Sequence, residues 1–398
     1  MLSNGLGELL HREAPSHSRF VDLFCGSGAV SWFVAKESRH PVLAVDIQEY
    51  GVALARAVIG RTSAVRPSRL KSLFVAPAQL ACQTAPYWRE ANGLDSMGLC
   101  PAEWTYRARR LCSTADSGVI FRAYGGHYYS PSQAIALDAL MRLLPVKGAD
   151  REVCLAALLI AASDCAAAPG HTAQPFQPTK TAGTYIQEAW NKDIFLYVCK
   201  SLVEICALHA QVRGTASVDD ALAVAASLAR DDLVFLDPPY AGVHYSRFYH
   251  VLETIARGRC GAVSGVGRYP PPEERPASAF SRKGESRGAF ERILWSLSKV
   301  GCTVIVTFPA GECSNGLSGQ TVLTLAERHF RVECTRVDSR FSTLGGNNLL
   351  RSARTTIHEM ILLLRPANRT SARAAPQQQI GRARHAGNSR LASERAWV

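Results

Sequence analysis

A four-residue apolar run leads directly into an acidic residue, two prolines and a tyrosine in Leu233-Val234-Phe235-Leu236-Asp237-Pro238-Pro239-Tyr240. An uninterrupted apolar run of this length is typical of a strand buried on both faces. The prolines fix the backbone and offer carbonyl groups without competing N–H groups. The Asp237 carboxylate and the Pro238 carbonyl can therefore both face a planar amine, while Tyr240 can stack on its ring. A plain turn with two prolines is the alternative, and the position after a buried strand argues against it.

A glycine-rich turn follows an earlier apolar run, in the segment Asp22-Leu23-Phe24-Cys25-Gly26-Ser27-Gly28. Residues 20–24 are expected to form a strand, and residues 29–35 the helix that follows. Glycines allow a tight turn and a close approach of the backbone to a ligand at the start of that helix. Ser31 stands where a dinucleotide fingerprint has its third glycine, so nicotinamide binding is disfavoured. A generic sharp turn is the alternative for this motif.

Further strands are expected at residues 41–45, 215–218, 304–308 and 357–364, and the stretch 51–210 is expected to be a mainly helical insertion. Strands that alternate with helices predict an α/β fold, a Rossmann-like, doubly wound and mostly parallel sheet with helices on both faces. Asp46 ends the second strand, where an adenosine ribose would present its two hydroxyls, and Asp219 and Asp220 end the third. A solvated strand end is the alternative for Asp46.

Composition and charge restrict the function classes. The chain has 398 residues, 47% of them hydrophobic and 20% charged, as in ordinary globular proteins. Its net charge of +12 points to a polyanionic partner such as nucleic acid. The 12 cysteines include no Cys-x-x-Cys pair and no histidine at ligand spacing, so a metal site is not expected and a reduced cytosol is. No apolar run is long enough for a membrane span, and no signal peptide is expected.

At its two motifs the chain resembles the amino-methyltransferases of DNA, most closely the adenine-specific class related to Dam, the D12 class. In that class the glycine motif precedes the recognition region, and the Asp-Pro-Pro-Tyr motif follows it. The resemblance covers residues 18 to 50 and 213 to 250 well, with a looser likeness through residue 364. It implies a class I methyltransferase fold, S-adenosylmethionine as cofactor, and methyl transfer to N6 of an adenine flipped out of double-stranded DNA.

The resemblance also implies roles for particular residues. Those at the cofactor would be Asp22, Phe24, Gly26 and Gly28 along its length, Asp46 at the ribose, and Asp219 or Asp220 at the adenine. Those at the target base would be Asp237, Pro238, Pro239 and Tyr240.

Other chemistries remain as alternatives. C5-cytosine methylation needs a cysteine nucleophile, usually after proline, and the sequence has no Pro-Cys pair. N4-cytosine methylation uses the same amine chemistry, but its motif usually begins with serine, so Asp237 favours adenine. An RNA methyltransferase acting on adenine or guanine amines is the alternative enzyme. A degenerate DNA-binding protein on a methyltransferase fold is the alternative outside enzymes.

Base recognition is expected in the insertion, where residues 169–180 are polar and stiffened by proline. The candidates are His171, Gln174, Gln177 and Lys180, and Arg282 and Lys283 are candidates for phosphate contacts. A solvated connector and a solvated turn are the alternatives for these two segments.

The expected organisation has four parts: residues 1–60 begin the methyltransferase domain, 61–210 form the helical insertion and recognition region, 211–365 complete the domain, and 366–398 form a disordered basic tail. The tail carries six arginines and one glutamate.

The expected location is cytoplasmic and DNA-associated, with a restriction or phage-defence system as a possible partner and no membrane. The resembling class usually has a Gly-Gly-Lys segment before the glycine motif; here only Tyr124-Gly125-Gly126-His127 is similar, with an ordinary aromatic loop as its alternative.

Overall fold

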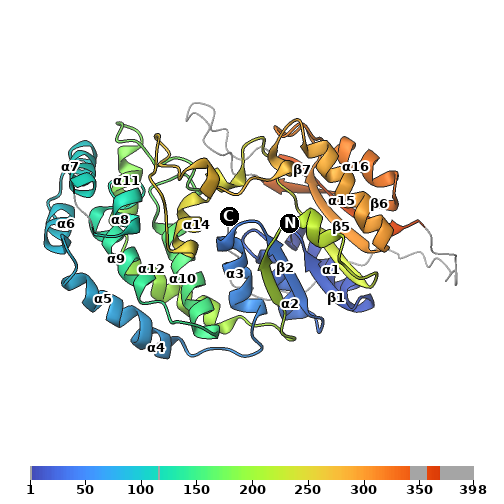
Figure 1. Ribbon diagram of the computed structural model, residues 1–398, viewed down its shortest axis with the longest axis horizontal. Helices are drawn as coiled ribbons and strands as arrows, with labels where there is room; N and C mark the ends of the chain where they lie inside the picture. Colours follow the sequence, from blue (N-terminus) through green and yellow to red (C-terminus); the bar gives the residue numbers. More distant parts are fainter. Residues whose placement is uncertain (1, 115–116, 341–355, 368–398) are drawn as a thin grey trace, which may run out of the picture.

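The computed structural model describes residues 2–114, 117–340 and 356–367. Figure 1 shows two lobes side by side, a sheet with its covering helices and a lobe built of helices, with α14 (His250–Arg257) between them. The basic tail expected after residue 366 lies outside the described residues, apart from Pro366 and Ala367.

The sheet has seven strands in the order β3-β2-β1-β4-β5-β7-β6. The first five strands in this order run parallel, and β7 is antiparallel to both β5 and β6. The predicted fold class, a doubly wound and mostly parallel sheet, is therefore confirmed. The strands are β1 (Arg19–Asp22), β2 (Val42–Asp46), β3 (Thr215–Val218), β4 (Asp232–Leu236), β5 (Thr303–Pro309), β6 (Phe330–Arg340) and β7 (Thr356–Pro366).

Alternate residues of the strands enter two separate cores, because successive side chains of a strand point to opposite faces. On one face, Val21, Val234 and Val304 pack with α13, α15 and α16. On the other face, Phe20, Leu233 and Ile305 pack with α1, α2 and α3. The helices of the first face are α13 (Ala221–Ala225), α15 (Ser286–Val300) and α16 (Gly319–Glu327), and those of the second are α1 (Leu6–Glu13), α2 (Ala29–Glu37) and α3 (Glu49–Ile59).

The helical lobe confirms the mainly helical character expected of residues 51–210. Its helix α9 begins with a capping box, in which Ser130 and Gln133 exchange side-chain and backbone hydrogen bonds. Asp193 caps α12 in a similar way. The lobe contains α4 (Pro67–Leu70), the π-helix η3 (Lys71–Val75), α5 (Ala76–Gln83), α6 (Trp88–Asp95), α7 (Pro101–Thr114), α8 (Val119–Tyr124), α9 (Pro131–Arg142), α10 (Ala149–Cys165), α11 (Gly183–Trp190) and α12 (Ile194–Ala207).

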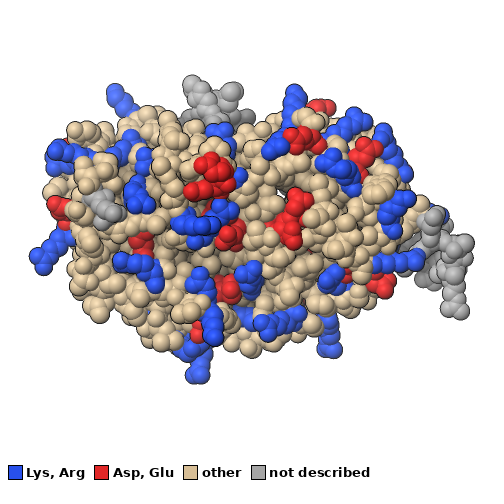
Figure 2. All heavy atoms as spheres, in the orientation of Figure 1, with Lys and Arg blue, Asp and Glu red and all other residues tan. Residues whose placement is uncertain are grey.

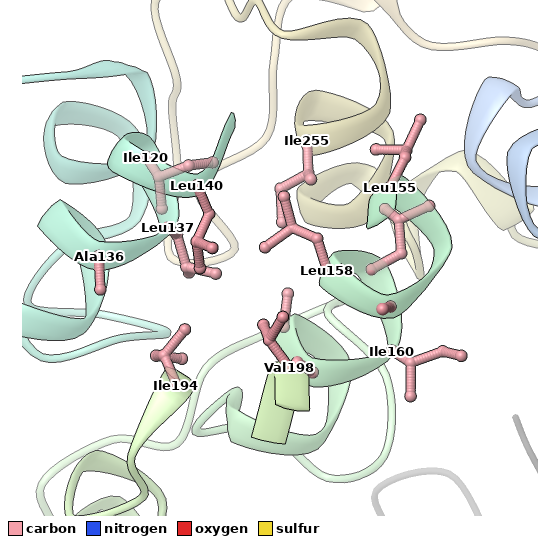
Figure 3. Close-up of a cluster of buried hydrophobic side chains, with 14 of the residues drawn as sticks. Ile120, Ala136, Leu137, Leu140, Leu155, Leu158, Ile160, Ile194, Val198 and Ile255 are labelled. Carbon is pink, nitrogen blue, oxygen red and sulfur yellow. The ribbon is translucent and has the colours of Figure 1, made fainter. Parts of the chain in front are cut away.

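Helix α14 joins the helical lobe to the sheet through a shared core. Figure 3 shows Ile255 of α14 facing Leu158 of α10, and both residues are fully enclosed in the lobe's hydrophobic cluster. Helix α14 also contacts α3, which lies against the sheet. Burial of several large aliphatic side chains in one cluster holds the lobe against α3 and α14, at about 25 cal/mol per Å² of apolar area.

Two elements differ from what the sequence predicted. Strand β6 was not expected, although Phe330, Val332 and Cys334 alternate with charged residues at its start. Helix α1 was also not expected; Leu6 and Leu10 bury one face of it in the core beneath β1. The predicted first strand, residues 20–24, is shorter in the structure and ends at Asp22, because Leu23 and Phe24 already belong to the turn.

Candidate active site

The two sequence motifs meet at the point where the strand order reverses. Strands β1 and β4 are adjacent and parallel, with Asp22 paired to Phe235. The turn after β1 and the Asp237–Tyr240 loop after β4 therefore leave the same edge of the sheet side by side. In an open α/β sheet this crevice, at the carboxyl ends of the strands, is where ligands bind.

The two glycines of the turn have different roles. Gly28 adopts a φ of 81°, and a Cβ there would lie 2.9 Å from Trp32 Nε1 and 3.2 Å from the Cα of Ala55. Gly28 thus allows α2 to approach α3 closely. Gly26 has a φ of 48°, and a Cβ there would meet no atom nearer than 3.9 Å. Gly26 therefore leaves open space above the turn, where a ligand can approach the backbone.

Asp46 connects the glycine turn to the start of α3. Its Oδ2 accepts the Gly26 N–H at 2.9 Å, and its Oδ1 accepts the Gln48 N–H at 2.9 Å. Each oxygen keeps a second lone pair, so the half-buried carboxylate can still accept hydrogen bonds from a ligand's hydroxyls. Burial raises the pKa of Asp46, and the two backbone N–H groups oppose that shift.

Asp22 lies buried beneath the glycine turn. Its carboxylate accepts the Ser31 hydroxyl at 2.7 Å and the Phe24 N–H at 3.3 Å. Burial raises the pKa of Asp22 to about 7, with a smaller contribution from the negative charges of Asp237 and Asp46. Asp22 therefore supports the turn from below, and the three carboxyl groups lie within electrostatic range of one another.

Asp237 is held at one oxygen and open at the other. The Thr307 hydroxyl, on β5, donates to its Oδ1 at 2.9 Å, and no hydrogen bond from a described residue reaches Oδ2. The residue is exposed to solvent, yet the surrounding protein raises the pKa of Asp237 to about 6, an effect that the Thr307 hydrogen bond opposes. At neutral pH Asp237 is thus an ionised acceptor with one oxygen available.

Asn315 fixes the backbone of the Asp237–Tyr240 loop from behind. This fully buried side chain donates from Nδ2 to the carbonyls of Pro239 at 3.0 Å and Phe280 at 3.1 Å. Its backbone N–H reaches the Tyr240 carbonyl at 3.4 Å. Within the described chain the Pro238 carbonyl receives no hydrogen bond, so it stays available beside Asp237.

Aromatic rings extend from the loop toward α3. The Tyr240 and Tyr245 rings lie edge to face at 6.3 Å, Tyr245 lies 6.4 Å from Tyr249, and Tyr249 lies 5.2 Å from Tyr50. Tyr240 is only half-buried, so part of its ring remains open for stacking against a planar ligand.

Glu253 connects the segment after the Asp237–Tyr240 loop to the segment after Asp46. It lies on α14 and accepts the backbone N–H groups of Glu49 at 3.1 Å and Tyr50 at 3.0 Å, and so caps the start of α3 from another helix. Arg257 pairs with it at 2.7 Å. The helix after the Asp237 loop thereby positions the helix after Asp46.

A family model matches the parts of the chain that build this site. The model describes the D12 class N6 adenine-specific DNA methyltransferases, and it matches residues 2–84 and 187–265. Over these two stretches, which make up less than half of the chain, the sequence is similar to this family. No curated protein matches the chain. The family match indicates that the enzyme is a DNA adenine N6-methyltransferase. The matched residues include the glycine turn, Asp46 and the Asp237–Tyr240 loop.

The remaining residues expected at the cofactor lie at the same edge of the methyltransferase sheet. Asp219 and Asp220 follow β3, and the Asp219 N–H donates to the Asp46 carbonyl at 3.0 Å. The Asp220 side chain caps α13 by accepting from Leu222 and Ala223. Both aspartates are exposed, and Asp220 already has a structural role. The Asp219 carboxylate accepts one backbone N–H, that of Asp220 at 2.8 Å, whereas the Asp220 carboxylate accepts two, so Asp219 has more capacity left to meet a ligand.

The residues expected to contact DNA are dispersed. His171 is buried against Phe248, with its Nδ1 accepting the Ala173 N–H at 3.1 Å. Gln177 bonds Arg109 and its own neighbour Pro175, whereas Gln174 and Lys180 are exposed. In the second segment Lys283 is exposed, and Arg282 pairs with Glu285. Of the candidates His171, Gln174, Gln177 and Lys180 in this loop, Gln174 and Lys180 are the exposed ones.

The Gly125-Gly126 turn does not lie at the cofactor edge. A Cβ at Gly126 would meet the backbone of Arg109 at 2.7 Å, so this turn packs against α7. The Tyr124 hydroxyl pairs with Thr254 of α14 at 2.8 Å. The segment thus belongs to the helical lobe (Figure 1), and the idea that it replaces a Gly-Gly-Lys segment beside the glycine turn is wrong.

Sequence reasoning missed Thr307, Asn315 and Glu253. Thr307 could have been found from the sequence, because it lies in the expected strand at residues 304–308. That strand pairs with β4, which leads directly into Asp237. Asn315 and Glu253 carry no motif; only the tertiary fold brings them to the site. Over the described residues, no helix is long and apolar enough to cross a membrane.

Proposed function

We propose that the enzyme transfers a methyl group from S-adenosylmethionine to N6 of an adenine flipped out of double-stranded DNA, at a specific recognition sequence. The observation that carries this proposal is the pair of available acceptors, Asp237 Oδ2 and the Pro238 carbonyl, next to the glycine turn. An exocyclic amine has two N–H groups, and this pair of acceptors matches them.

The residues around the glycine turn suit a cationic cofactor that carries a ribose. Asp22, Asp46 and Asp237 interact electrostatically, and no lysine or arginine of the described residues forms an ion pair with them. A positive sulfonium centre would offset their mutual repulsion. Asp46 retains lone pairs for the ribose hydroxyls, Asp219 is placed for the adenine, and Gly26 lets the ligand approach the backbone.

When bound, S-adenosylmethionine supplies an electrophilic methyl group on a positively charged sulfur. The enzyme's residues then hold the amine in line with that methyl, which is chiefly a task of positioning. Hydrogen bonds from N6–H to Asp237 and to the Pro238 carbonyl favour a tetrahedral nitrogen whose lone pair is free to attack. As the N–C bond forms and the C–S bond breaks, N6 loses a proton. Asp237, ionised at neutral pH and open to solvent, can take that proton and pass it to water.

Tyr240 would hold the plane of the flipped base. Its ring is braced by Tyr245 and partly open. Stacking of a base on an aromatic side chain is worth about 1–3 kcal/mol on alanine substitution.

Sequence specificity, a cytoplasmic location and a restriction or phage-defence partner stay predictions from the family resemblance.

Substitution of Asp237 tests the proposal. In Asp237→Ala, methyl transfer to DNA should be abolished while S-adenosylmethionine still binds, because the carboxylate faces the acceptor amine. Asp231→Ala is the matched control, since Asp231 is exposed at the opposite end of β4. The assay follows labelled methyl incorporation into duplex DNA, with an RNA of the same sequence in parallel. Near-normal turnover by Asp237→Ala, or preferential labelling of the RNA, would refute the proposal.

A further inference from the structure

Basic side chains alone do not locate the path of DNA on this enzyme. Figure 2 shows lysines and arginines spread over the whole of the drawn face, with acidic side chains near its middle. Several arginines of the described chain form ion pairs, for example Arg69 with Asp150 and Arg328 with Glu291. Arginines that lack an acidic partner are more informative, because a polyanion can neutralise them without breaking an existing pair.

Three such cationic or protonatable side chains converge directly after the target-base loop. They are His244, Arg247 and Arg275, here called the arginine cluster. Within the described residues, neither arginine side chain forms a hydrogen bond or an ion pair, and the Nε atoms of both are buried without a partner. The His244 Nδ1 is likewise buried and unpartnered.

The arginine cluster is held in place by an aromatic ring. Arg247 lies over the Tyr269 ring at 4.5 Å from its centroid, and Arg275 lies 5.8 Å from the same centroid. Cation–π stacking orients the planar guanidinium groups and restricts their rotamers before any ligand arrives. Side chains fixed in this way lose less conformational entropy on binding an anion.

The carboxylates near the arginine cluster are bound to other groups. Glu253 and Glu274 line one pocket with Arg275, but Glu253 pairs with Arg257 and Glu274 accepts the Gly261 N–H. Burial and the positive charges of Arg282, Arg275 and Arg247 lower the pKa of His244, and only Glu285 opposes them. Glu285 is itself paired with Arg282 at 2.9 Å. Half-buried like charges without a counterion repel one another, and an incoming anion would relieve this repulsion.

The position of the arginine cluster identifies the anion. Arg247 ends the short helix η4 (Tyr245–Arg247), and the Tyr245 ring at its start contacts Tyr240 of the target-base loop. On the other side, the Tyr269 hydroxyl donates to the Ala173 carbonyl of the expected recognition loop at 2.6 Å. The cluster therefore lies between the residues that would hold the base and the residues expected to read the sequence.

We infer that the arginine cluster binds the DNA backbone phosphates next to the flipped adenine. The inference rests on the proposed function for the identity of the neighbouring base, and it adds a phosphate site that holds the extruded nucleotide's backbone. The guanidinium groups of Arg247 and Arg275 offer paired N–H donors, which suit the oxygens of a phosphodiester. The cluster thus positions the substrate, and the chemistry belongs to Asp237.

The test measures DNA affinity against salt for Arg247→Gln, Arg275→Gln and the double variant. Log affinity falls with log salt in proportion to the phosphates neutralised, so each substitution should reduce the slope by about 1 and the double variant by about 2. Each single variant should bind DNA roughly tenfold to a hundredfold more weakly. Arg39→Gln is the matched control, because Arg39 is exposed between α2 and β2, at the opposite edge of the sheet, and should leave slope and affinity unchanged.

A second measurement places the contact at particular phosphates. The probe is a duplex bearing the sequence that the enzyme methylates in cells, with neutral methylphosphonates replacing single phosphates around the target adenine. The wild type should lose affinity at one or two of these positions, and the double variant should show no further loss there. Arg247→Lys, which keeps the charge but loses the planar fork, should retain the wild-type slope with reduced affinity.

An unchanged slope in the double variant, or methylphosphonate losses that are fully additive with the substitutions, would overturn the inference. Melting temperature and S-adenosylmethionine affinity show whether the variants are folded. DNA binding is measured without methyl transfer, so a failed phosphate site leaves the Asp237→Ala result standing. A failed Asp237→Ala test likewise leaves the salt slopes interpretable.

Discussion

The Thr307 hydroxyl donates a hydrogen bond to Asp237 Oδ1 across two adjacent parallel strands, at 2.9 Å. It orients the carboxylate and leaves Oδ2 for the target amine. It also lowers the pKa of Asp237 against the larger desolvating effect of the surrounding protein, which raises that pKa to about 6. One neighbouring side chain thus controls both the direction and the ionisation of the group proposed to bind adenine.

Replacing Thr307 by valine should change the pH dependence of methylation. Loss of the hydrogen bond raises the pKa of Asp237 further, and only ionised Asp237 can take the proton that the amine loses. Activity is therefore present above this pKa and is lost as pH falls through it. We expect the acid limb of the kcat profile to move to higher pH in Thr307→Val, with the smallest difference from wild type above pH ~8. Profiles that superimpose would show that Thr307 does not act on Asp237.

Asp46→Ala should weaken S-adenosylmethionine binding, because the ribose loses a charged acceptor and the Gly26 N–H loses its partner. Hydrogen bonds to charged groups contribute about 1.5–3 kcal/mol, so affinity should fall roughly tenfold to a hundredfold. Calorimetry measures the change. Glu37→Ala is the control, since Glu37 is exposed at the end of α2.

A cofactor analogue without ribose hydroxyls separates the two roles of Asp46. The wild type should bind this analogue more weakly than S-adenosylmethionine, whereas Asp46→Ala should discriminate little between them. Equal discrimination by the two proteins would mean that Asp46 only supports the glycine turn.

Asn315→Ala should reduce kcat with little effect on cofactor affinity. The substitution removes the hydrogen bonds to the Pro239 and Phe280 carbonyls and leaves the buried Leu317 N–H without its acceptor. The Asp237–Tyr240 loop then becomes less well positioned, at a cost of about 1–3 kcal/mol. Ser314→Ala, which removes only the bond to the Gly242 N–H, should have a smaller effect.

Steady-state kinetics at saturating DNA and cofactor measure the effect on kcat. If Asn315→Ala lost cofactor affinity and kcat in parallel, the residue would support the fold generally instead of positioning the target-base loop.

The sequence predicted the parts of this enzyme whose physical cause is local. Leu233 to Leu236 had to be a buried strand, and Asp237 and Gly26 had to follow the ends of parallel strands, so their meeting at one sheet edge followed from the topology. The family model is consistent with that prediction. The interior strands were identified from their uninterrupted apolar runs, such as Leu233 to Leu236.

The residues that sequence reasoning missed depend on tertiary contacts. Glu253 caps α3 from a residue 204 positions away, and Asn315 holds a loop 76 positions before it. His171 was predicted to face DNA because it lies in a polar loop, but Phe248 covers its ring.

Asp22 gives a prediction about stability and pH. Its folded pKa of about 7 lies above its ordinary value of 3.8, so the folded enzyme binds a proton that the unfolded chain releases. This contribution to stability is fully present below pH ~4 and is lost as pH rises through about 7. Such a pKa difference corresponds to roughly 4 kcal/mol at most, on the order of 1.4 kcal/mol per pH unit.

Asp22→Asn should remove that pH dependence while keeping the local hydrogen bonds. The amide oxygen can accept the Phe24 N–H, and the amide nitrogen can donate to Ser31 once its hydroxyl rotates. Denaturant unfolding of the cofactor-free enzyme at several pH values between 5 and 8 would measure the free energy of unfolding. We expect the wild type to lose more stability than Asp22→Asn as pH rises, because only the wild type must ionise a buried carboxyl group.

Ser31→Ala provides a second check on the pKa of Asp22. The substitution removes a hydrogen bond that favours the ionised form, so it raises the pKa of Asp22. The free energy of unfolding should then keep falling with pH over a range that extends above 7. Parallel stability curves for wild type and Asp22→Asn would show that Asp22 is ionised throughout this range.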